Sequence, residues 1–553
     1  MRFVQPYMFC VTPTMWVLAL LISLSASVHS IGKAHFVALN VLNVDATLLG
    51  VAPGDTVYLE SGKRTRFKIS NIKGDSLHYV VVTNKGGDVI IENSEHHFGV
   101  VFSNCSYFRF TGSVDNSANY GMRILKTGPG ASGLSLGELC TNYEVDHVEI
   151  SNTGFAGIFA FTHPTCDMLS NRGYFEQRNT IIRDNYIHDT YGEGMYLGHS
   201  FYAGYTQSCD GVDVTLFPHE IKNLKVYNNK IVNAGYDGIQ VSSAVKGTEV
   251  YNNTILNYGT AHEEMQHSGI QIGAGTELRC YNNTIINGSG TGIMMMGVGG
   301  STIFNNVIVN AGLDFYPNNE ALRIYGIFVD DRFVVPQTSI NILNNTIINT
   351  KSDGIRFFST ATVNNIIANN LIVNPGSTYL YLPDITSYIN IKAGVNAQLL
   401  NNYYTKYIQS EFKSDSLLSV YSRIASLPLA ARGLDVRKYG VEKDIFDTIR
   451  HVTPSIGAFE FEPQENLYSV KKNEIELSHN TKTDIILIEN KSINSIRALN
   501  IFSLNGTKVF GIKVDEPRFL TVNLKGVLKQ GLYVLSVERF NSVFTYKFVI
   551  TAV

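Results

Sequence analysis

One short phrase recurs through the middle of this chain and limits what it can fold into. The phrase reads Asn-Asn-x-Ile, with Asp-Asn-Tyr-Ile as its first form, and its second Asn recurs at intervals of 44, 24, 30, 23, 39 and 25 residues. The copies begin at residues 184, 228, 252, 282, 305, 344 and 369. Three intervals lie near 24 residues, and the longer ones indicate insertions. Such a pattern is typical of a solenoid whose loops leave the stack on one side.

A second phrase, Gly-Ile-x-Ile, follows the first at a regular distance. In four copies a glycine stands nine residues after the second Asn, at Gly194, Gly238, Gly292 and Gly354. Two further copies, at 269 and 326, follow an insertion. Apolar residues at alternate positions indicate strands and not helices, because the side chains of a strand alternate between its two faces. Each unit therefore contains at least two short strands, one in each phrase.

A unit this small cannot bury its apolar face alone, so successive units must stack. Stacking places Ile on Ile and Asn on Asn about 4.8 Å apart and forms parallel sheets with hydrogen-bonded Asn at the bends. The repeats between about 90 and 405 resemble those of the right-handed parallel β-helix proteins of the pectate-lyase-like superfamily. This resemblance implies an all-β fold with a right-handed parallel β-helix at 31–462. A small β-sandwich is expected at 463–553 from the separate resemblance of the last segment, given below. The phrase Ser455–Glu460 resembles the one that commonly closes such bacterial domains.

The N-terminus resembles a secretion signal. An apolar run at 15–24 precedes Val28 and Ser30, whose sizes suit cleavage, so we expect residues 1–30 to be removed. The run is too short to span a bilayer, and we expect no transmembrane segment in the mature chain. A net charge of −3 provides no long-range attraction to nucleic acid. The expected location is outside the cell or on its surface.

Five cysteines remain after Cys10 is removed with the signal. An odd number in an exported protein leaves at least one free thiol. Cys166 and Cys209 lie in long insertions, so one hypothesis is a disulfide between them that links two loops. The alternative is that all five are unpaired.

The last segment, from about 466, has a different pattern. Residues 499–509 predict a hairpin with an Asn-Gly turn, and further strands follow at 521–524, 531–537 and 546–550. The set resembles the C-terminal sorting domain of the type IX secretion system of Bacteroidetes. That resemblance implies the type IX machinery as a partner and no catalytic role. An ordinary adhesion module is the alternative.

The chemistry is then expected on the outer face of the Gly-Ile strands. The middle residues of these strands should point to solvent in one row: Arg123, Phe159, Tyr196, Gln240, Gln271, Met294, Phe328 and Arg356. The residues before each glycine should form a second row: Tyr120, Ala156, Glu193, Asp237, Ser268, Thr291, Tyr325 and Asp353. Insertions at 199–223, 258–268 and 311–325 would wall a groove over these rows.

Glu193 and Asp237 fall one coil apart, roughly 5 Å by strand spacing. This separation is similar to that of the carboxyl pair in retaining glycosidases. Alternatively, each acidic side chain only binds turn amides before the glycine. We name Glu193 and Asp237 as candidate catalytic residues.

A lyase would need a base and a cation that neutralises the uronate carboxylate. Tyr196, His199 or His267 could supply the base, and Arg123, Lys126 or Arg356 could supply the cation. The motifs of known β-helix alginate and chondroitin lyases are not recognisable, and neither are those of polygalacturonases. Candidate substrate-binding residues are Arg123, Gln240, Gln271, Tyr325, Phe328 and Arg356.

No metal site or cofactor is predicted. His262 and His267 are five residues apart and not the four that one helical face requires for zinc. Calcium, which is often seen in β-helix lyases, could bind Glu263, Asp330 or Asp331. We expect a monomer.

Two classes of function remain open. The first is a secreted polysaccharide-degrading enzyme, either a glycoside hydrolase or a polysaccharide lyase. The second is a non-catalytic surface β-helix that binds glycans or acts in adhesion. The polar cluster covers only two or three coils, whereas a pure binder would repeat its contacts along the stack, so the enzyme is favoured.

Overall fold

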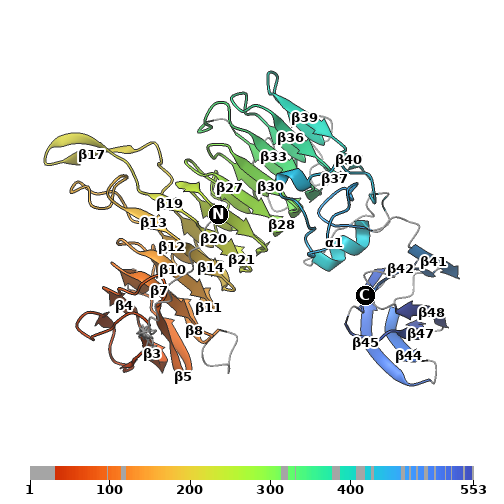
Figure 1. The fold of residues 1–553 in the computed structure, drawn as a ribbon, viewed down its shortest axis with the longest axis horizontal. Helices are drawn as coiled ribbons and strands as arrows, with labels where there is room; N and C mark the ends of the chain where they lie inside the picture. The colour runs from red at the N-terminus through yellow and green to blue at the C-terminus, as the bar shows by residue number, and fades with distance from the viewer. Residues whose placement is uncertain are drawn as a thin grey trace, which may run out of the picture.

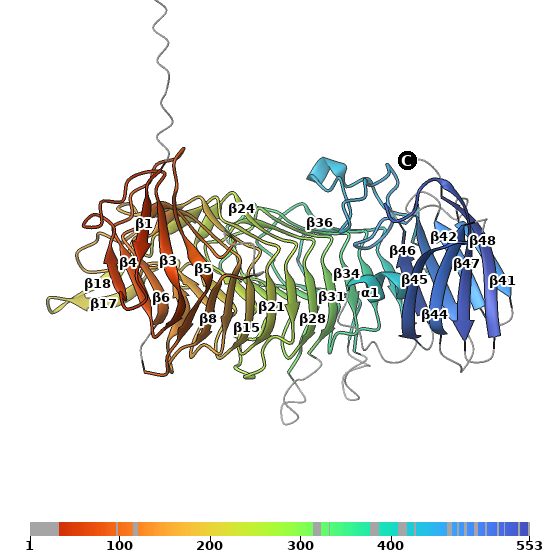
Figure 2. The same cartoon turned by 90° about the horizontal axis from the view of Figure 1, so that it is seen from below.

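A computed structural model shows a long stack of parallel coils followed by two antiparallel sheets (Figures 1 and 2). It describes residues 32–95, 98–113, 120–312, 322–330, 332–376, 386–406, 417–424, 427 and 429–461. From 467 to 550 it describes all residues except 473–474, 481–483, 491–495, 504–505, 517–518, 525 and 540–541. The predicted signal peptide lies outside the described residues. Among the residues described, no helix is long and apolar enough to cross a membrane.

Each coil of the stack has three sides. One side, the Gly-Ile sheet, contains 12 parallel strands within the described residues. They are β2 (Asn43–Asp45), β4 (Phe67–Ser70), β6 (Phe98–Ser103), β9 (Ser132–Ser135), β12 (Ile158–Ala160), β16 (Met195–Leu197), β22 (Ile239–Val241), β26 (Ile270–Ile272), β29 (Ile293–Met295), β32 (Ile327–Val329), β35 (Ile355–Phe357) and β38 (Ile389–Ile391).

The other two sides form one continuous sheet that bends at the Asn phrase. The side before the bend contains β7 (Ser106–Thr111), β10 (Thr141–Asp146), β14 (Thr180–Arg183), β20 (Lys225–Tyr227), β24 (Thr248–Tyr251), β27 (Leu278–Tyr281), β30 (Ser301–Phe304), β33 (Ile340–Leu343), β36 (Asn365–Ala368) and β39 (Ala397–Leu400). The side after it contains β8 (Met122–Lys126), β11 (Val148–Ser151), β15 (Tyr186–Thr190), β21 (Lys230–Ala234), β25 (Thr254–Leu256), β28 (Thr284–Gly288), β31 (Val307–Ala311), β34 (Thr346–Ile348), β37 (Leu371–Val373) and β40 (Tyr403–Thr405). Both sides begin in β1 (Ala34–Val37), β3 (Thr56–Arg64) and β5 (Val80–Glu92). The prediction of a right-handed parallel β-helix is confirmed.

The Asn phrase makes the bend because its two Asn residues have different tasks. The first Asn of each phrase adopts positive φ, 55° at Asn228 and 54° at Asn282, which Asn tolerates better than most residues. The second Asn points inward and forms a ladder: Asn253 Nδ2 donates to Asn283 Oδ1 at 3.0 Å, and Asn283 repeats this with Asn306. The predicted hydrogen-bonded Asn at the bends is confirmed.

The glycine of the second phrase is required by close packing and not by its φ. A Cβ at Gly238 would lie 2.6 Å from both the carbonyl oxygen of Gly269 and a methyl carbon of Ile255. Contacts this short do not occur, so only glycine allows neighbouring coils to approach here. The isoleucines that follow are buried and stack in register, as Ile239 on Ile270.

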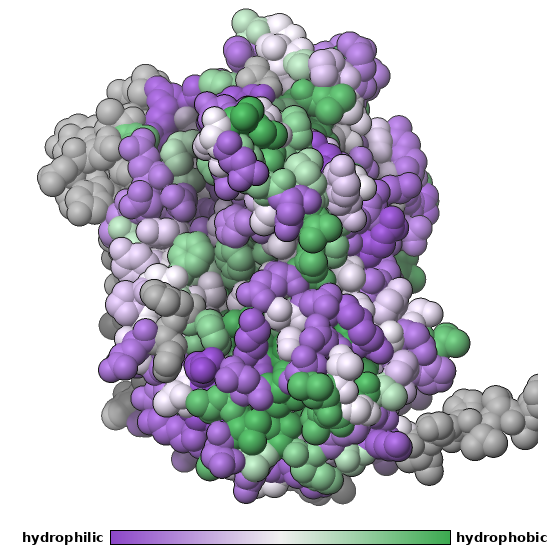
Figure 3. Space-filling model, turned by 90° about the vertical axis from the view of Figure 1, so that its left-hand side faces the viewer, coloured by the Kyte–Doolittle hydropathy of each residue, from purple (hydrophilic) through white to green (hydrophobic). Residues whose placement is uncertain are grey.

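One prediction about the first coils needs correction. The phrase Gly121–Ile124 was expected among the Gly-Ile strands, but it forms β8 on another side, because β8 pairs with β5 and β11. The strand that takes its place is β9, which pairs with β6 and β12. These coils also expose apolar side chains, among them Phe36 and Leu48. Figure 3 shows the side of the molecule that lies at the left of Figure 1, with hydrophobic residues gathered toward its lower end.

Two excursions leave the stack near β16. Strands β13 (Glu176–Arg178), β19 (Glu220–Lys222) and β23 (Ala244–Lys246) form a short parallel sheet beside the coils. Strands β17 (Tyr205–Cys209) and β18 (Val212–Leu216) form an antiparallel hairpin that projects beyond the stack in Figure 1. The predicted disulfide between Cys166 and Cys209 is present and joins this hairpin to the loop at 163–175. Cys105, Cys140 and Cys280 are free and buried.

The chain after the last coil turns back along the stack. Helix α1 (Leu417–Ile424) and residues 456–461 cover apolar side chains of β28, β31, β34 and β37. Gly457 N donates to Asn369 O at 2.7 Å, and the buried Arg450 donates to Asn305 Oδ1 at 2.6 Å. The closing phrase Ser455–Glu460 therefore lies against the side of the stack, next to the Asn bend. The short 3₁₀ helix η2 (Arg437–Tyr439) lies in the same segment.

The last segment forms two antiparallel sheets around one core, as predicted for a sandwich. One contains β41 (Leu467–Lys472), β42 (Ile475–Asn480), β43 (Ile485–Asn490) and β46 (Phe519–Asn523). The other contains β44 (Ile496–Ser503), β45 (Lys508–Glu516), β47 (Gly531–Arg539) and β48 (Ser542–Ile550). The predicted hairpin at 499–509 is the pair β44 and β45.

Candidate functional site

Glu193 and Asp237 occupy equivalent positions on neighbouring coils. Each stands immediately before the glycine of its coil, two residues before β16 and β22, which pair in register at Met195 and Ile239. The backbone repeats this register, because Gly194 N donates to Asp237 O at 2.9 Å. The two carboxyl-bearing residues are therefore one strand spacing apart, about 4.8 Å.

Both carboxyl groups are buried without a cation among the described residues. Glu193 is 1% exposed and Asp237 is 0% exposed. Asp237 Oδ1 accepts a hydrogen bond from Ser268 N at 2.5 Å, whereas Asp237 Oδ2 and Glu193 Oε2 have no partner in the described part of the chain. Burial raises the pKa of Glu193 to about 7. Burial, and next the charge of Glu193, raise the pKa of Asp237 well above its ordinary value. Both shifts favour the protonated form, so the pair keeps its protons to higher pH than exposed carboxyl groups do.

Asp353 shows what a purely structural carboxylate does at the same position. It also precedes the glycine of its coil, and its Oδ1 accepts a hydrogen bond from Ser387 N at 2.7 Å. Its Oδ2, however, accepts a hydrogen bond from Asn390 Nδ2 at 3.1 Å and lies 3.6 Å from Arg356 Nη1. Asp237 repeats the backbone hydrogen bond, but three residues on, where Asp353 has Arg356, it has the uncharged Gln240, and its counterpart on the preceding coil is Glu193. Binding turn amides, the alternative reading, therefore accounts for one oxygen of Asp237 and not for the other.

A short hydrogen-bonded chain lies next to the pair on the outer face of the Gly-Ile sheet. Tyr196 Oη is 2.8 Å from Ser200 Oγ, which accepts a hydrogen bond from Gln240 Nε2 at 2.6 Å. Burial raises the pKa of Tyr196, and the charges of Glu193 and Asp237 raise it by smaller amounts. These three groups therefore share one neighbourhood. Ser200 was not anticipated from the sequence.

The middle row follows the predicted order from Phe159 to Arg356, but its exposure differs from the prediction. Gln240 and Gln271 are buried and do not point freely into solvent. For Gln240 the reason is the segment after β16, whose Ser200 binds it directly. Gln271 Oε1 has no hydrogen-bond partner among the described residues.

The two candidate histidines are buried and differ in their surroundings. Burial, and next the neighbouring His163 and His219, lower the pKa of His199 to about 4. His199 Nδ1 accepts a hydrogen bond from Phe201 N at 3.2 Å. Burial, and next His262, lower the pKa of His267 to about 4. His267 directly precedes Ser268, whose backbone N–H binds Asp237. Both imidazoles are neutral at pH 7.

The other predicted binding residues form a separate cluster further along the sheet. Arg356 Nη1 donates to Tyr325 Oη at 2.9 Å, and its guanidinium lies 4.0 Å from the ring centre of Phe358. Phe328 contacts the rings of Tyr325 and Phe358. On the sheet, β35 follows β16 after four intervening strands, so this cluster does not reach the carboxyl pair.

Arg123 is not part of this site, which corrects the prediction that placed it in the row. It lies in β8 on a different side of the coils and donates from Nε to Glu149 Oε2 at 2.7 Å. Lys126 lies at the end of the same strand. On the N-terminal side of the pair, the cation that the described coils place in the row is Lys68 of β4, which three strands separate from β16. Its Nζ lies 3.3 Å from Glu138 Oε2.

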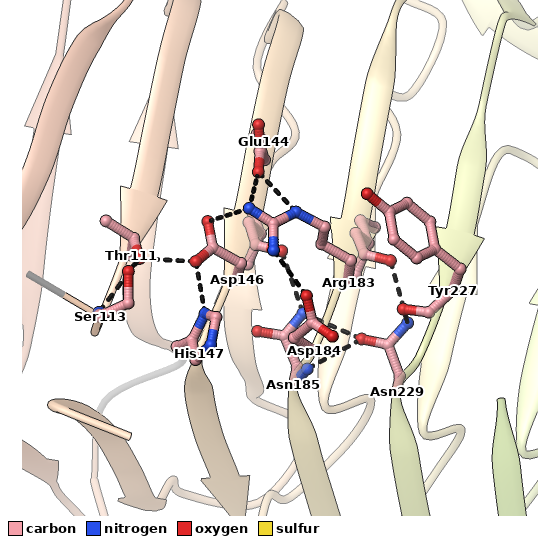
Figure 4. A network of polar contacts seen from close by, with 12 residues as sticks. Thr111, Ser113, Glu144, Asp146, His147, Arg183, Asp184, Asn185, Tyr227 and Asn229 are labelled. Atoms are coloured by element: carbon pink, nitrogen blue, oxygen red, sulfur yellow. Dashed lines mark hydrogen bonds and ion pairs between the residues drawn. The ribbon is translucent and has the colours of Figure 1, made fainter. Parts of the chain in front are cut away.

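A second group of buried charges lies on the side of the coils that contains β10 and β14 (Figure 4). Asp146 is 0% exposed, and both its oxygens accept hydrogen bonds from Arg109, at 2.6 and 2.9 Å. Thr111 Oγ1 donates to it at 2.7 Å, and His147 Nδ1 lies 2.6 Å away. Burial acts to raise the pKa of Asp146, but these hydrogen bonds, Arg109 first, leave it below the ordinary value. Here the buried carboxylate is fully compensated.

Aromatic rings next to Tyr196 were missed at the sequence level. Six rings, named here the ring belt, contact one another in a chain: Phe161, His163, Tyr196, His199, Phe201 and Tyr205. The signal was present as two aromatic-rich stretches, 155–163 and 196–205, that flank β12 and β16. Only the register of the coils shows that these stretches meet.

The described candidate calcium ligands do not form a metal site. Asp330 pairs with Arg332 at 3.0 Å, and Asp331 lies outside the described residues. Among the residues that the structure describes, no three His, Cys, Asp or Glu are grouped to hold a metal ion.

Comparison with protein families agrees with the fold. The model of the right-handed β-helix region family matches residues 210–402. Similar solved structures include a pectate lyase, with 13% identity, coverage of 78% of this chain and 97% of that one, and a TM-score of 0.39. An alginate lyase from Paenibacillus has 14% identity, coverage of 59% and 99%, and a TM-score of 0.36. A lacto-N-biosidase from Eubacterium ramulus has 11% identity, coverage of 68% and 67%, and a TM-score of 0.40. No curated protein matches significantly.

Proposed function

We propose that this protein cleaves glycosidic bonds of a polysaccharide, with one carboxyl group of the Glu193–Asp237 pair as the acid–base group and the other as the nucleophile. The observation that supports this is the pair itself, two buried carboxyl groups on neighbouring coils with no cation among the described residues. A structural carboxylate at the same position, Asp353, has a cation within 3.6 Å. Groups that keep a proton at neutral pH because of their surroundings are typical of acid–base sites.

The spacing of the pair suits a retaining hydrolase. Neighbouring strands are about 4.8 Å apart, close to the roughly 5–5.5 Å between the carboxyl groups of retaining glycosidases. With one shared proton, the protonated carboxyl donates to the glycosidic oxygen as the bond breaks. The ionised carboxyl attacks the anomeric carbon, and water later releases the sugar as the proton returns.

Access to the pair requires a movement, because both carboxyl groups are buried. The excursion at 258–268 lies next to Asp237: backbone N–H groups of 259–261 donate to the carbonyls of 234–236, and Ser268 N binds Asp237. We infer that the sugar displaces part of this excursion when it binds.

A lyase fits less well, because a lyase must neutralise a uronate carboxylate. Arg123 and Lys126 lie on another side of the coils, and Arg356 is engaged with Asp353 and Tyr325. One observation supports the non-catalytic alternative, glycan binding or adhesion: both carboxyl groups are buried. The experiment below distinguishes this alternative from an enzyme.

The test combines a substrate screen with matched variants. The protein without residues 1–30 is assayed on neutral and uronate polysaccharides, with reducing ends and the absorbance of unsaturated products measured in parallel. Hydrolysis releases reducing ends without that absorbance, and the Glu193→Gln variant should lose nearly all of the activity. Asp353→Asn is the control, because it alters the same position on a coil outside the pair. Unsaturated products would identify a lyase, and an absence of cleavage on every polymer would favour the binder.

We also propose that the protein is exported and that the sandwich at 466–553 directs it to the cell surface through a type IX system. The support is the resemblance of this segment and its two antiparallel sheets. A chain that ends at Phe461 should remain in the periplasm of its native host. Circular dichroism of the purified truncated chain checks that the coils remain folded, because β43 also packs against the cluster around α1. Normal surface delivery of the truncated chain would contradict the proposal.

A further inference from the structure

We propose that the substrate is an uncharged glycan, whose sugar rings stack on the exposed rings of the ring belt as the chain approaches the carboxyl pair. This inference rests on the proposed function and adds the substrate class to it. It follows from the order of the rings, from the rigidity of the excursion that carries them and from the location of the cations.

The ring belt leads from solvent to Tyr196 through successive ring contacts. At its outer end Phe201 is 62% exposed, and its ring centre lies 5.7 Å from that of His199 and 6.0 Å from that of Tyr205. His199 stacks on Tyr205 at 5.5 Å with an interplanar angle of 9°. At its inner end Phe161 contacts both His199, at 5.0 Å, and Tyr196, at 4.9 Å. Tyr196 is the residue whose hydroxyl group shares the neighbourhood of Glu193.

Aromatic rings with one exposed face suit sugars, because the apolar face of a pyranose can cover a ring while the edges remain polar. Tyr and Phe supply large contact areas with few rotatable bonds. His163 is exposed next to Phe161, at 5.0 Å between ring centres. The accessible aromatic surface is therefore the outer part of the belt, Phe201, Tyr205 and His163. The buried rings of Phe161 and His199 connect this outer part to Tyr196.

The excursion that carries Phe201 and Tyr205 is held in place. The disulfide between Cys166 and Cys209 joins its hairpin to the loop at 163–175. Arg172 donates to Tyr202 O at 2.6 Å and lies 3.9 Å from the centre of the Tyr202 ring. A platform that is already ordered loses little conformational entropy when a ligand binds.

No free cation is found along this route in the described residues. The middle row from Phe159 through Tyr196, Gln240, Gln271 and Met294 to Phe328 carries no charge. Arg172 is bound to backbone carbonyls and lies near Glu220, and Arg356 pairs with Asp353. A polyuronate would place one carboxylate per sugar beside a buried carboxyl pair with nothing to offset the repulsion. An uncharged chain meets no such cost.

The Glu193→Gln variant allows binding to be measured separately from cleavage. Isothermal titration with cellohexaose, xylohexaose and mannohexaose is compared with titration of hexagalacturonate and hexamannuronate. We expect at least one neutral hexamer to bind and neither uronate to bind. Adding Phe201→Ala should weaken that binding roughly 3- to 10-fold, as expected for one aromatic contact. Tyr174→Ala is the matched control, because Tyr174 is 69% exposed on the neighbouring loop without a ring contact to the belt among the described residues.

Each outcome decides one of the two proposals. Binding of a uronate alone, or of no neutral hexamer, overturns the inference about the substrate. Equal loss of affinity in the Phe201 and Tyr174 variants also overturns it. If a neutral hexamer binds through Phe201 but Glu193→Gln cleaves it as fast as the unmodified protein, the substrate class stands and the proposed catalytic pair is wrong.

Discussion

Two buried acidic regions of the same solenoid have opposite electrostatics. Asp146 and Asp237 are both 0% exposed and both lie between neighbouring coils. Asp146 receives two guanidinium hydrogen bonds, a hydroxyl group and an imidazole, and its pKa is lowered. Asp237 receives one backbone N–H and has a second carboxyl group as its neighbour, and its pKa is raised. The first arrangement stabilises a charge, whereas the second stores a proton, and only the second is suited to acid–base chemistry.

The largest expected effect is on catalysis. Glu193→Gln and Asp237→Asn should each reduce turnover on the cleaved glycan by roughly 10²- to 10⁴-fold, the usual contribution of a general acid or base. Asp146→Asn should leave turnover unchanged, because Asp146 lies on another side of the coils. Initial rates of the three variants at pH 7 and at a temperature below all their Tm values check this. Equal losses in all three would mean that the two regions do not differ in function.

The second effect is on stability at neutral pH. Here the variant of Asp146 should lose more than the variant of Glu193, the reverse of the order expected for turnover. Asp146→Asn leaves Arg109 beside a group that no longer carries charge, which should cost about 3 kcal/mol of unfolding free energy, as for other broken buried pairs. Glu193→Gln removes a carboxyl group that resists ionisation and should not destabilise the protein. Urea unfolding of both variants measures the difference. A larger loss in Glu193→Gln would assign Glu193 a structural role.

The dependence of stability on pH should distinguish the regions by its sign. The pKa of Glu193 is about 7 in the folded chain and 4.5 in the unfolded one, so the folded state binds more protons between these values. Its contribution is complete below pH 4.5 and falls as pH rises through 7, by at most about 3 kcal/mol. The lowered pKa of Asp146 acts in the other direction, since its contribution is present above pH 4 and is lost at more acid pH. The Tm difference between Glu193→Gln and the unmodified protein should therefore grow from pH 5 to pH 8, and a constant difference would contradict it.

The smallest expected effect concerns the outer edge of the Asp146 network. Glu144 is 21% exposed and accepts a hydrogen bond from Arg183 Nε at 2.7 Å. Glu144→Gln should cost no more than about 1 kcal/mol, because partly exposed ion pairs contribute little and are screened by salt. Unfolding in 0.05 and 0.5 M NaCl measures this. A loss as large as that of Asp146→Asn would show that the whole network acts as one buried unit.

The sequence was sufficient for the parts of this fold that repeat. The Asn phrase and the Gly-Ile phrase predict the coil, the register and the row that places Glu193 next to Asp237, because each is set by a contact between identical residues of neighbouring coils. Arg123 was misplaced because Gly121–Ile124 has the same alternation as a Gly-Ile strand. Only its pairing with β11 reveals the side to which it belongs.

Features that depend on contacts between different excursions could not be predicted in this way. The ring belt joins two stretches from different coils, and no repeat in the sequence links them. The burial of Gln240 depends on Ser200, a residue of an insertion. The surroundings of the pair lack a cation because the fold places the arginines elsewhere. The alternation of residues along one strand does not predict that placement.

The ladder of second Asn residues has a consequence for how such a chain can change in length. From Asn185 through Asn283 to Asn370, each Asn donates its Nδ2 to the Asn Oδ1 at the same bend of the following coil. A whole coil could therefore be gained or lost and the ladder would close again around the gap. An insertion of one residue inside a coil would instead displace the glycine that lets neighbouring coils approach. Variation among descendants of this protein should accordingly occur as complete turns or as excursions, and the position of Glu193 relative to Asp237 should survive both.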